Sequence, residues 1–291
     1  MSSPIKVFGI FGDPIGHSLS PIIHNAAFLS SNLPYHYVSF QVPKERLKEA
    51  VAAISALGIG GINVTIPHKE AIIPFLSGFS DQAKKMGAVN TVEVLDNQLI
   101  GHNTDGLGFL KSLSEANVDP SGLRVILLGA GGAARGVAVS LLNAHISELC
   151  ILARSTERRK MLKDDLSSLF PNADISEHPF DKNDFEDVPT LLINSTPLGM
   201  KQGDPLPYPP HRLYPSFVVA DLVYNPFKTP LIFSAEKVGA NIVPGIGMLL
   251  HQAALSFEIF TKQKAPIEAM RTAILAYFLK KTGIPLSKQA I

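Results

Sequence analysis

A largely apolar run that leads straight into glycines lies near the middle of the chain. Residues 123–128 have the composition of a strand buried on both faces, and Gly129-Ala130-Gly131-Gly132-Ala133-Ala134 follows at once. Such glycines permit a tight turn and a close backbone approach, and the next helix presents free N–H groups and its positive dipole end. The segment predicts a strand, turn and helix that bind the pyrophosphate of a dinucleotide. The alternative is a structural turn without a ligand.

The fingerprint starts well inside a chain of 291 residues, which is long enough for about two domains. Strand and helix patterns already alternate before it, which indicates a largely parallel sheet. We therefore expect an α/β fold of two α/β domains. Residues 1–104 form a domain with a parallel-rich sheet, residues 105–239 form a Rossmann-type dinucleotide-binding domain, and residues 240–291 form helices that return to the first domain.

The expected elements come from apolar periodicity and turn residues. Strands are predicted at 5–10, 35–41, 61–64, 91–95, 99–101, 123–128, 148–153, 191–194 and 217–220, and helices at 21–30, 44–57, 105–115, 157–169, 246–262 and 267–281. The proline-rich residues 205–215 are predicted to form a surface loop of the second domain.

Charge and composition exclude several kinds of partner. Lys plus Arg (26) nearly balances Asp plus Glu (25), so no strong field attracts nucleic acid or an anionic membrane. No apolar stretch approaches the roughly 18 to 20 residues of a membrane span, and no signal-peptide pattern follows the first apolar run, so we expect a cytoplasmic protein. Cys150 is the only cysteine, and the histidines show no metal-ligand spacing, so no metal is expected. A homodimer is compatible with the sequence, which does not fix the oligomeric state.

The end of the second strand of the dinucleotide unit indicates which cofactor binds. An NAD site usually has Asp or Glu there, roughly 20 residues after the glycines, whereas this chain has Arg154. Arg158 lies one turn further on if a helix starts near Ser155, and two guanidinium groups can clamp a 2′-phosphate. This pattern predicts NADP. The alternative is that Arg154, Arg158, Arg159 and Lys160 form only a solvated helix start, but cations there oppose the helix dipole.

Four polar clusters fall at predicted loop positions in the first domain and near the domain boundary. Residues 12–21 carry Ser18 and Ser20, both of which can donate to a carboxylate; the alternative is that Ser20 is only an N-cap before Pro21. Residues 63–69 end a strand, where open α/β folds bind ligands. Residues 87–91 and 103–106 add amides and a carboxylate. Together they suit a small polyhydroxylated ligand.

These motifs resemble those of the shikimate dehydrogenase family, and the resemblance extends over essentially the whole chain. The matching elements occur in the family's order: Ser18-Leu19-Ser20-Pro21, Asn63-Val64-Thr65 through Lys69, Gly87 to Thr91, Asn103-Thr104-Asp105, Gly129 to Ala134, Asn194 to Met200, and Met248-Leu249-Leu250-His251-Gln252. One departure lies in the cofactor region, where the family's usual Asn-Arg-Thr reads Ala153-Arg154-Ser155 and an amide side chain is lost.

The resemblance implies an NADP-dependent oxidoreductase that reversibly reduces 3-dehydroshikimate to shikimate, on the pathway to chorismate and the aromatic amino acids. It implies a first domain that binds substrate, with substrate contacts from Ser18, Ser20, Asn63, Thr65, Lys69, Asn90, Asp105, Tyr224 and Gln252. It implies cofactor contacts from Gly129, Ala130, Gly131, Gly132, Ala133, Ala153, Arg154, Ser155, Arg158, Thr196, Met200, Leu222 and Gly245.

Lys69 and Asp105 are the expected catalytic pair. Reduction of a ketone requires a proton donor at the oxygen where negative charge develops, and an ammonium group can stabilise the alkoxide and release a proton. Asp105 would orient Lys69 and the reacting hydroxyl. From the residues alone, a salt bridge at a domain boundary is the better explanation of the pair, and the surrounding motifs reverse that preference.

Two other functions remain as alternatives, and a third is excluded. A short-chain dehydrogenase would use Tyr-x-x-x-Lys on a helix, and Tyr224 to Lys228 match that string, but Pro226 opposes a helix there. A related enzyme with relaxed specificity would accept quinate as well as shikimate. A noncatalytic NADP-sensing protein would lack the proton-transfer residues, whereas Lys69 and Asp105 are both present.

Overall fold

The computed structural model describes residues 5–182 and 184–283. Its internal contacts divide the chain into two units: one comprises the chain up to Thr104 and again from Leu250, and the other runs from Asp105 to Leu249. The second boundary therefore lies at Leu249, inside helix α8 (Gly245–Thr261), rather than at residue 239. The reason is that strand β12 (Asn241–Val243) joins the second sheet and keeps this stretch of chain in the second unit.

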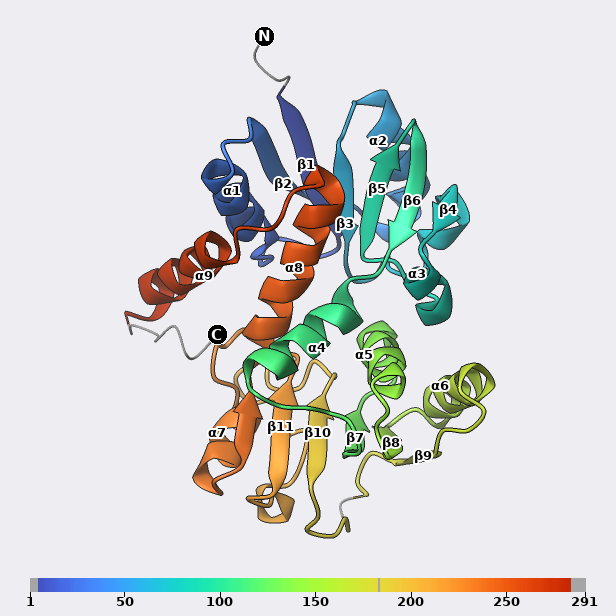
Figure 1. Cartoon of the computed structure of the whole chain (residues 1–291), viewed down its shortest axis with the longest axis vertical. Coiled ribbons are helices and arrows are strands. Elements are labelled where there is room, and N and C mark those ends of the chain that lie inside the picture. Colours follow the sequence, from blue (N-terminus) through green and yellow to red (C-terminus); the bar gives the residue numbers. More distant parts are fainter. Residues whose placement is uncertain (1–4, 183, 284–291) are drawn as a thin grey trace. The chain divides into compact units, whose positions relative to one another are not determined.

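The first unit contains a six-stranded mixed sheet (Figure 1). Its strands are β1 (Lys6–Gly12), β2 (Tyr35–Gln41), β3 (Gly61–Val64), β4 (Gly78–Phe79), β5 (Thr91–Leu95) and β6 (Gln98–His102), in the order β2-β1-β3-β5-β6-β4. Strand β1 is parallel to both neighbours, whereas β5 is antiparallel to β3 and β6. Asp96 and Asn97 both have positive φ (48° and 64°), as a two-residue hairpin turn between β5 and β6 requires.

Helices cover both faces of this sheet. They are α1 (Ser20–Ser30), α2 (Leu47–Ala56), α3 (Asp81–Met86), α9 (Ile267–Thr282) and the part of α8 after Leu249, with 3₁₀ turns at Lys44–Arg46 and Ile73–Phe75. Val51 of α2 and Ile62 of β3 share one buried cluster. On the other face, the ring of Phe8 lies 5.3 Å from Phe28 of α1 and 5.2 Å from Phe260 of α8. Polar side chains on this face of the first sheet therefore face helix α8.

The second unit contains a six-stranded parallel sheet. Its strands are β7 (Arg124–Leu128), β8 (Glu148–Ala153), β9 (Ile175–Pro179), β10 (Thr190–Asn194), β11 (Phe217–Asp221) and β12, in the order β12-β11-β10-β7-β8-β9. Its helices are α4 (Asp105–Glu115), α5 (Gly132–Asn143), α6 (Thr156–Leu169) and α7 (Pro230–Lys237), with a 3₁₀ turn at Pro210–Arg212. The first strand, β7, is central, and the direction of winding reverses between β7 and β10. This order confirms the predicted Rossmann architecture and places the crevice at that reversal.

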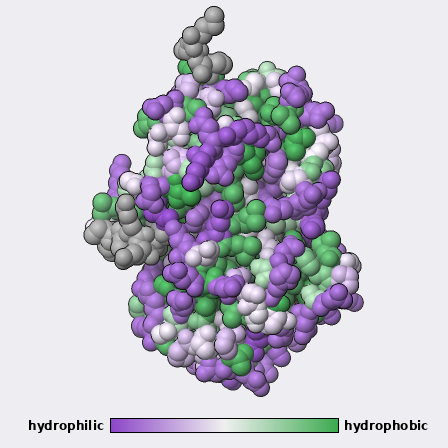
Figure 2. Space-filling view, viewed as in Figure 1, coloured by the Kyte–Doolittle hydropathy of each residue, from purple (hydrophilic) through white to green (hydrophobic). Residues whose placement is uncertain are grey.

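The surface is mostly polar on the face that Figure 2 shows, with apolar side chains scattered between charged ones. The described part of the chain contains no helix that is both long enough and apolar enough to cross a membrane. The Cys150 thiol is buried in β8, as the sequence predicts, and its surroundings raise its pKa to about 11, chiefly through burial.

Candidate functional site

Asn63 of β3 is the centre of a buried polar network in the first unit. Its Nδ2 donates to the backbone oxygen of Asn90 (3.1 Å) and lies 3.0 Å from the hydroxyl oxygens of Thr91 and Ser256. Its Oδ1 accepts a hydrogen bond from the hydroxyl of Tyr37 at 2.7 Å. Both ends of the amide are therefore held by the protein, and only a remaining lone pair of Oδ1 is left for a ligand.

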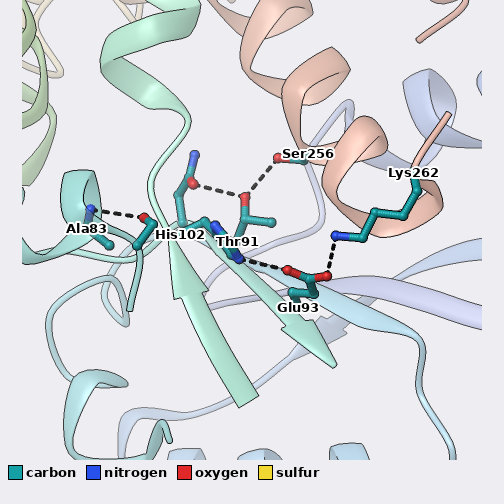
Figure 3. Close-up of polar contacts among 8 residues, drawn as sticks. Ala83, Thr91, Glu93, His102, Ser256 and Lys262 are labelled. Carbon is teal, nitrogen blue, oxygen red and sulfur yellow. Dashed lines mark hydrogen bonds and ion pairs between the residues drawn. The ribbon is translucent and has the colours of Figure 1, made fainter. Parts of the chain in front are cut away.

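Asn90 connects the third polar cluster to the fourth. Its Nδ2 donates to Thr104 Oγ1 (2.8 Å), and its Oδ1 accepts from the Thr104 backbone N–H (2.9 Å). The Thr104 hydroxyl donates to the backbone oxygen of Gln252 on α8 at 3.0 Å. Figure 3 shows Thr91 reaching Ser256 of α8 and, two residues along the same strand face, Glu93 between His102 and Lys262. The structure thus brings Asn63, Asn90 and the backbone of Gln252 into one network.

A turn after β3 holds Lys69 next to the same network. Val89 donates its N–H to the backbone oxygen of Lys69 at 2.8 Å, and the Lys69 residue is partly buried. The turn is anchored by His68, whose buried ring nitrogen Nε2 lies 2.7 Å from the backbone oxygen of Val42. Lys69 is therefore held beside Val89 and Asn90, at the carboxyl end of β3.

The first polar cluster lies beside the second. Thr65 donates its N–H to the backbone oxygen of Phe11 (2.9 Å), and a Cβ on Gly12 would lie 2.6 Å from Thr65 Cγ2. The expectation that Ser20 merely caps a helix is wrong, because α1 begins at Ser20 itself and its N-cap, Leu19, makes no side-chain cap. The hydroxyl of Ser20 instead accepts a hydrogen bond from the hydroxyl of Ser18 at 3.2 Å.

The glycine loop of the second unit lies at the reversal of the sheet. Gly129 has a φ of 113°, and a Cβ there would lie 2.6 Å from the hydroxyl of Ser195 on the loop after β10. Ser195 donates to the backbone oxygen of Leu128 at 2.6 Å. Gly131 caps α5 without a side-chain hydrogen bond, so no cap side chain occupies the N–H groups of the first turn. The residues present fit a bound pyrophosphate, because the loop excludes a side chain where the backbone must approach closely.

The basic residues after β8 separate into two kinds. Ser155 caps α6 by accepting the Arg158 N–H (3.3 Å), which confirms the predicted helix start. Arg159 forms an ion pair with Glu177 and donates to the backbone oxygen of Ala153 (3.2 Å). Arg154 and Arg158 are exposed, and neither makes an ion pair with another described residue. Arg159 therefore stabilises the fold, while the other two guanidinium groups can take a phosphate.

The sequence does not predict a buried hydrogen-bond network that lies behind the ends of β10 and β11. Asn194 accepts from the N–H (3.1 Å) and hydroxyl (2.7 Å) of Thr196 and donates to Asp221 Oδ1 (2.9 Å). Asp221 also accepts from the N–H of Val223 (3.0 Å) and the hydroxyl of Thr229 (2.6 Å). Burial raises the pKa of Asp221 to about 6 despite these three donors. The network fixes the loops that carry Thr196 and Leu222.

Gly245, another predicted cofactor residue, lies against the same loops. A Cβ at Gly245 would come within 2.6 Å of the backbone oxygen of Asp221 and 2.8 Å of that of Leu222. Met200 is 45% exposed after β10, and Tyr224 follows β11 outside any helix. The predicted cofactor residues of β10, β11 and the start of α8 therefore gather at the carboxyl edge of the second sheet.

The structure also bears on the alternatives. Residues 222–229 form no helix, which confirms that Tyr224 and Lys228 do not belong to a helical Tyr-x-x-x-Lys motif. Among residues 5–182 and 184–283, no three His, Cys, Asp or Glu side chains are grouped so that they could hold a metal ion. His24 is packed in the core, where burial lowers the pKa of its imidazole to about 3.

The fold and these two sets of residues define the class of two-domain α/β dehydrogenases that bind a dinucleotide. The model of the shikimate dehydrogenase substrate binding domain matches residues 10–92, and that of the shikimate 5′-dehydrogenase C-terminal domain matches residues 245–275. The chain is 40% identical to shikimate dehydrogenase (NADP(+)) of Desulfitobacterium hafniense, over 93% of this chain and 97% of the relative. The chain belongs to the shikimate dehydrogenase family.

Two solved structures extend the comparison. A shikimate dehydrogenase in complex with NADP⁺ has a TM-score of 0.88 and 38% identity, covering 94% of this chain and 96% of that one. The shikimate 5-dehydrogenase of Thermus thermophilus, in complex with NADP(H) and shikimate, has a TM-score of 0.83 and 30% identity, covering 92% and 98%.

Proposed function

We propose that this chain catalyses the NADP-dependent, reversible reduction of 3-dehydroshikimate to shikimate. The observation that carries the proposal is the likeness over nearly the whole chain to relatives named shikimate dehydrogenase (NADP(+)). The arrangement within each unit agrees with it, because four polar clusters gather at the carboxyl edge of the first sheet and the glycine loop lies at the reversal of the second. The cytoplasm as location and a homodimer as assembly belong to the same proposal.

The substrate is assigned to the first cluster, the turn after β3 and the network around Asn90. In this assignment Ser18 and Ser20, with Tyr224, hold the carboxylate. Thr65, Asn63, Asn90 and Gln252 hold the ring hydroxyls. The Asn63 and Asn90 amides each bond to protein at both ends, so the direct contribution of Asn63 is limited to Oδ1.

Lys69 is assigned the proton transfer, and Asp105 the orientation of the reacting hydroxyl. NADPH supplies the hydride when it is bound. Lys69 then has one task, which is to stabilise and protonate the oxygen that becomes negative. An ammonium group that is only partly exposed is suited to this, because its charge is less screened than in bulk water.

NADP is preferred to NAD in this proposal because Arg154 and Arg158 are exposed at the end of β8. Neither is committed to an ion pair with a described residue, unlike their neighbour Arg159. No carboxylate stands at the position where an NAD enzyme would bind the ribose hydroxyl. Ala153, which replaces the family's usual Asn, removes one polar contact from this site.

Steady-state kinetics on the purified chain test the activity directly. Shikimate and quinate are each offered with NADP and with NAD, and formation of the reduced cofactor is followed by its absorbance. We expect the highest kcat/KM with shikimate and NADP. Higher kcat/KM with quinate and NAD would support the relaxed enzyme, and cofactor binding without turnover would support the noncatalytic protein.

Lys69→Ala tests the role of the lysine. We expect turnover to fall by about 10² to 10⁴, the usual contribution of a positioned acid or base, while shikimate still binds. Lys85→Ala, which removes an exposed lysine of α3 in the same unit, is the matched control and should retain turnover. Turnover close to wild type in Lys69→Ala would exclude Lys69 as the proton-transfer group.

A further inference from the structure

Tyr37 and Asn63 of the first unit form a buried hydrogen bond with only one possible direction. The backbone oxygen of Asn90 can only accept, so the nitrogen of the Asn63 amide must face it and Oδ1 must face Tyr37. The Tyr37 hydroxyl therefore donates its only proton to Asn63 Oδ1. Burial raises the pKa of Tyr37 and the nearby Ser20 hydroxyl lowers it, so Ser20 directs its proton towards the tyrosine oxygen; Ser18 donates in turn to Ser20 at 3.2 Å.

Tyr37 is also held firmly by residues of helix α1. It is only 1% exposed, and Asn25 of α1 grips its backbone by accepting from its N–H (2.8 Å) and donating to its oxygen (2.9 Å). The imidazole of His24 stacks on its ring, with centroids 4.3 Å apart and planes 4° from parallel. Its backbone, ring and hydroxyl are thus each fixed by a different partner.

We propose that Tyr37 is a positioning residue for the substrate, joining the serine that meets the carboxylate to the amide that meets the ring hydroxyls. The inference rests on the proposed function, which assigns Ser20 and Asn63 to the substrate. The tyrosine itself is too deeply buried to touch a ligand. It acts by fixing the rotamer of the serine hydroxyl and the orientation of the amide before substrate arrives.

Loss of the Tyr37 hydroxyl removes its hydrogen bond to Asn63 and the oxygen beside Ser20, while the ring and its stacking remain. Asn63 Oδ1 then loses its donor and the Ser20 hydroxyl loses the oxygen beside it, so both groups are held less firmly. Substrate binding must afterwards order them, which weakens binding at both ends of the molecule. The cofactor residues lie on other strands, in the second unit, and keep their own partners.

Tyr37→Phe tests the proposal, with Tyr35→Phe as the matched control. Tyr35 lies on the same strand, packs its ring against Phe8 and Phe28, and its hydroxyl makes no hydrogen bond to a described residue. We expect Tyr37→Phe to raise the KM for shikimate about tenfold, as the loss of a net hydrogen bond does, with kcat and the KM for NADP changed by less than about twofold. Tyr35→Phe should leave all three values near those of the wild type.

A double-mutant cycle separates positioning from a general loss of structure. In an Asn63→Ala background, Tyr37→Phe should add much less than its own tenfold effect, because the amide through which it acts is gone. Asn25→Ala is a second, milder variant on an exposed residue, and it should raise the shikimate KM in the same direction by about twofold to threefold. Because Asn25 is exposed, the Asn25→Ala variant should fold and can be measured even if Tyr37→Phe does not fold.

Three results would overturn the role of Tyr37. These are an unchanged shikimate KM in Tyr37→Phe and Asn25→Ala, an equal rise in the KM for shikimate and for NADP, or full additivity in the Asn63→Ala background. Wild-type enzyme assayed in the same series keeps the two proposals apart. If the wild type fails to turn over shikimate, the proposed function fails; if only the variant pattern fails, the positioning role does.

Discussion

The charge state of Asp221 should control the stability of the second unit. Burial raises the pKa of Asp221 from 3.8 to about 6, and the residue is 1% exposed. Between these two values the folded chain carries a proton that the unfolded chain has lost. Its contribution to stability is therefore fully present below about pH 4 and is lost as the pH rises through about 6. Roughly two pKa units correspond to about 3 kcal/mol.

The substitution Asp221→Asn replaces the titrating carboxyl group with an amide that can keep the same hydrogen-bond partners. The amide oxygen can accept from Val223 and Asn194 as the carboxylate does, and the amide nitrogen can donate to Thr229. We expect the free energy of unfolding of the variant, relative to the wild type, to rise by about 3 kcal/mol between about pH 4 and pH 7. At about pH 4 the two proteins should be similar in stability, because both are then neutral at this position.

Urea denaturation followed by circular dichroism, at several pH values across this range, measures the difference. Asp174→Asn, which neutralises an exposed carboxylate of the same unit, is the control and should change the difference little. A difference between Asp221→Asn and wild type that is constant with pH would refute the reasoning. A variant that loses stability relative to wild type as the pH rises would show that the three donors outweigh burial.

The remaining predictions concern the cofactor loop and the arginines. Gly129→Ala should raise the KM for NADP by about tenfold or more, because its Cβ would meet Ser195 at 2.6 Å, whereas Gly203→Ala has a comparable positive φ with nothing nearby and should leave that KM unchanged. Equal effects of the two substitutions would assign the loss to backbone strain alone. Replacing Arg154 and Arg158 together with Ser should raise the KM for NADP by about 10² while leaving that for NAD within a few-fold, as measured by steady-state kinetics. A parallel loss for both cofactors would contradict a 2′-phosphate clamp.

Much of the fold follows from periodicity and turn residues. Strands 35–41, 61–64 and 91–95 and helix 105–115 have the predicted bounds, because in each the apolar period persists up to a turn or a polar residue. The glycine loop was predictable because buried strands followed by glycines leave few other folds open. Other elements were not: β4, β12 and α3 are too short for a periodic signal, and β9, whose sequence is ISEHP, has polar residues at its centre.

The site residues likewise divide into those that the sequence pattern predicts and those that only the fold reveals. Polar clusters at strand ends were predictable because a run of polar residues interrupts an apolar pattern, and the structure gathers those of the first unit at one sheet edge. Tyr37 and Asp221 were missed because each is a single residue in an otherwise ordinary strand. What makes them notable is a partner far along the chain: Asn63 is 26 residues from Tyr37, and Asn194 is 27 residues from Asp221. Only the folded structure brings such pairs together.

His24 and Asp221 have opposite consequences for the two units in acid. Burial lowers the pKa of His24 to about 3, so the stability it gives the first unit is present above about pH 6.5 and is lost as the pH falls towards 3. At about pH 4.5 this loss amounts to about 3 kcal/mol, whereas protonation of Asp221 stabilises the second unit over the same range.

Acidification should therefore lower the thermal transition of the first unit more than that of the second, which scanning calorimetry at about pH 7 and about pH 4.5 can measure. His24→Phe keeps an aromatic ring against Tyr37 without the titration, and it should bring the two transitions back towards each other in acid. Transitions that shift together in the wild type would contradict the opposite signs. An acid response unchanged by His24→Phe would show that groups other than this imidazole dominate the first unit.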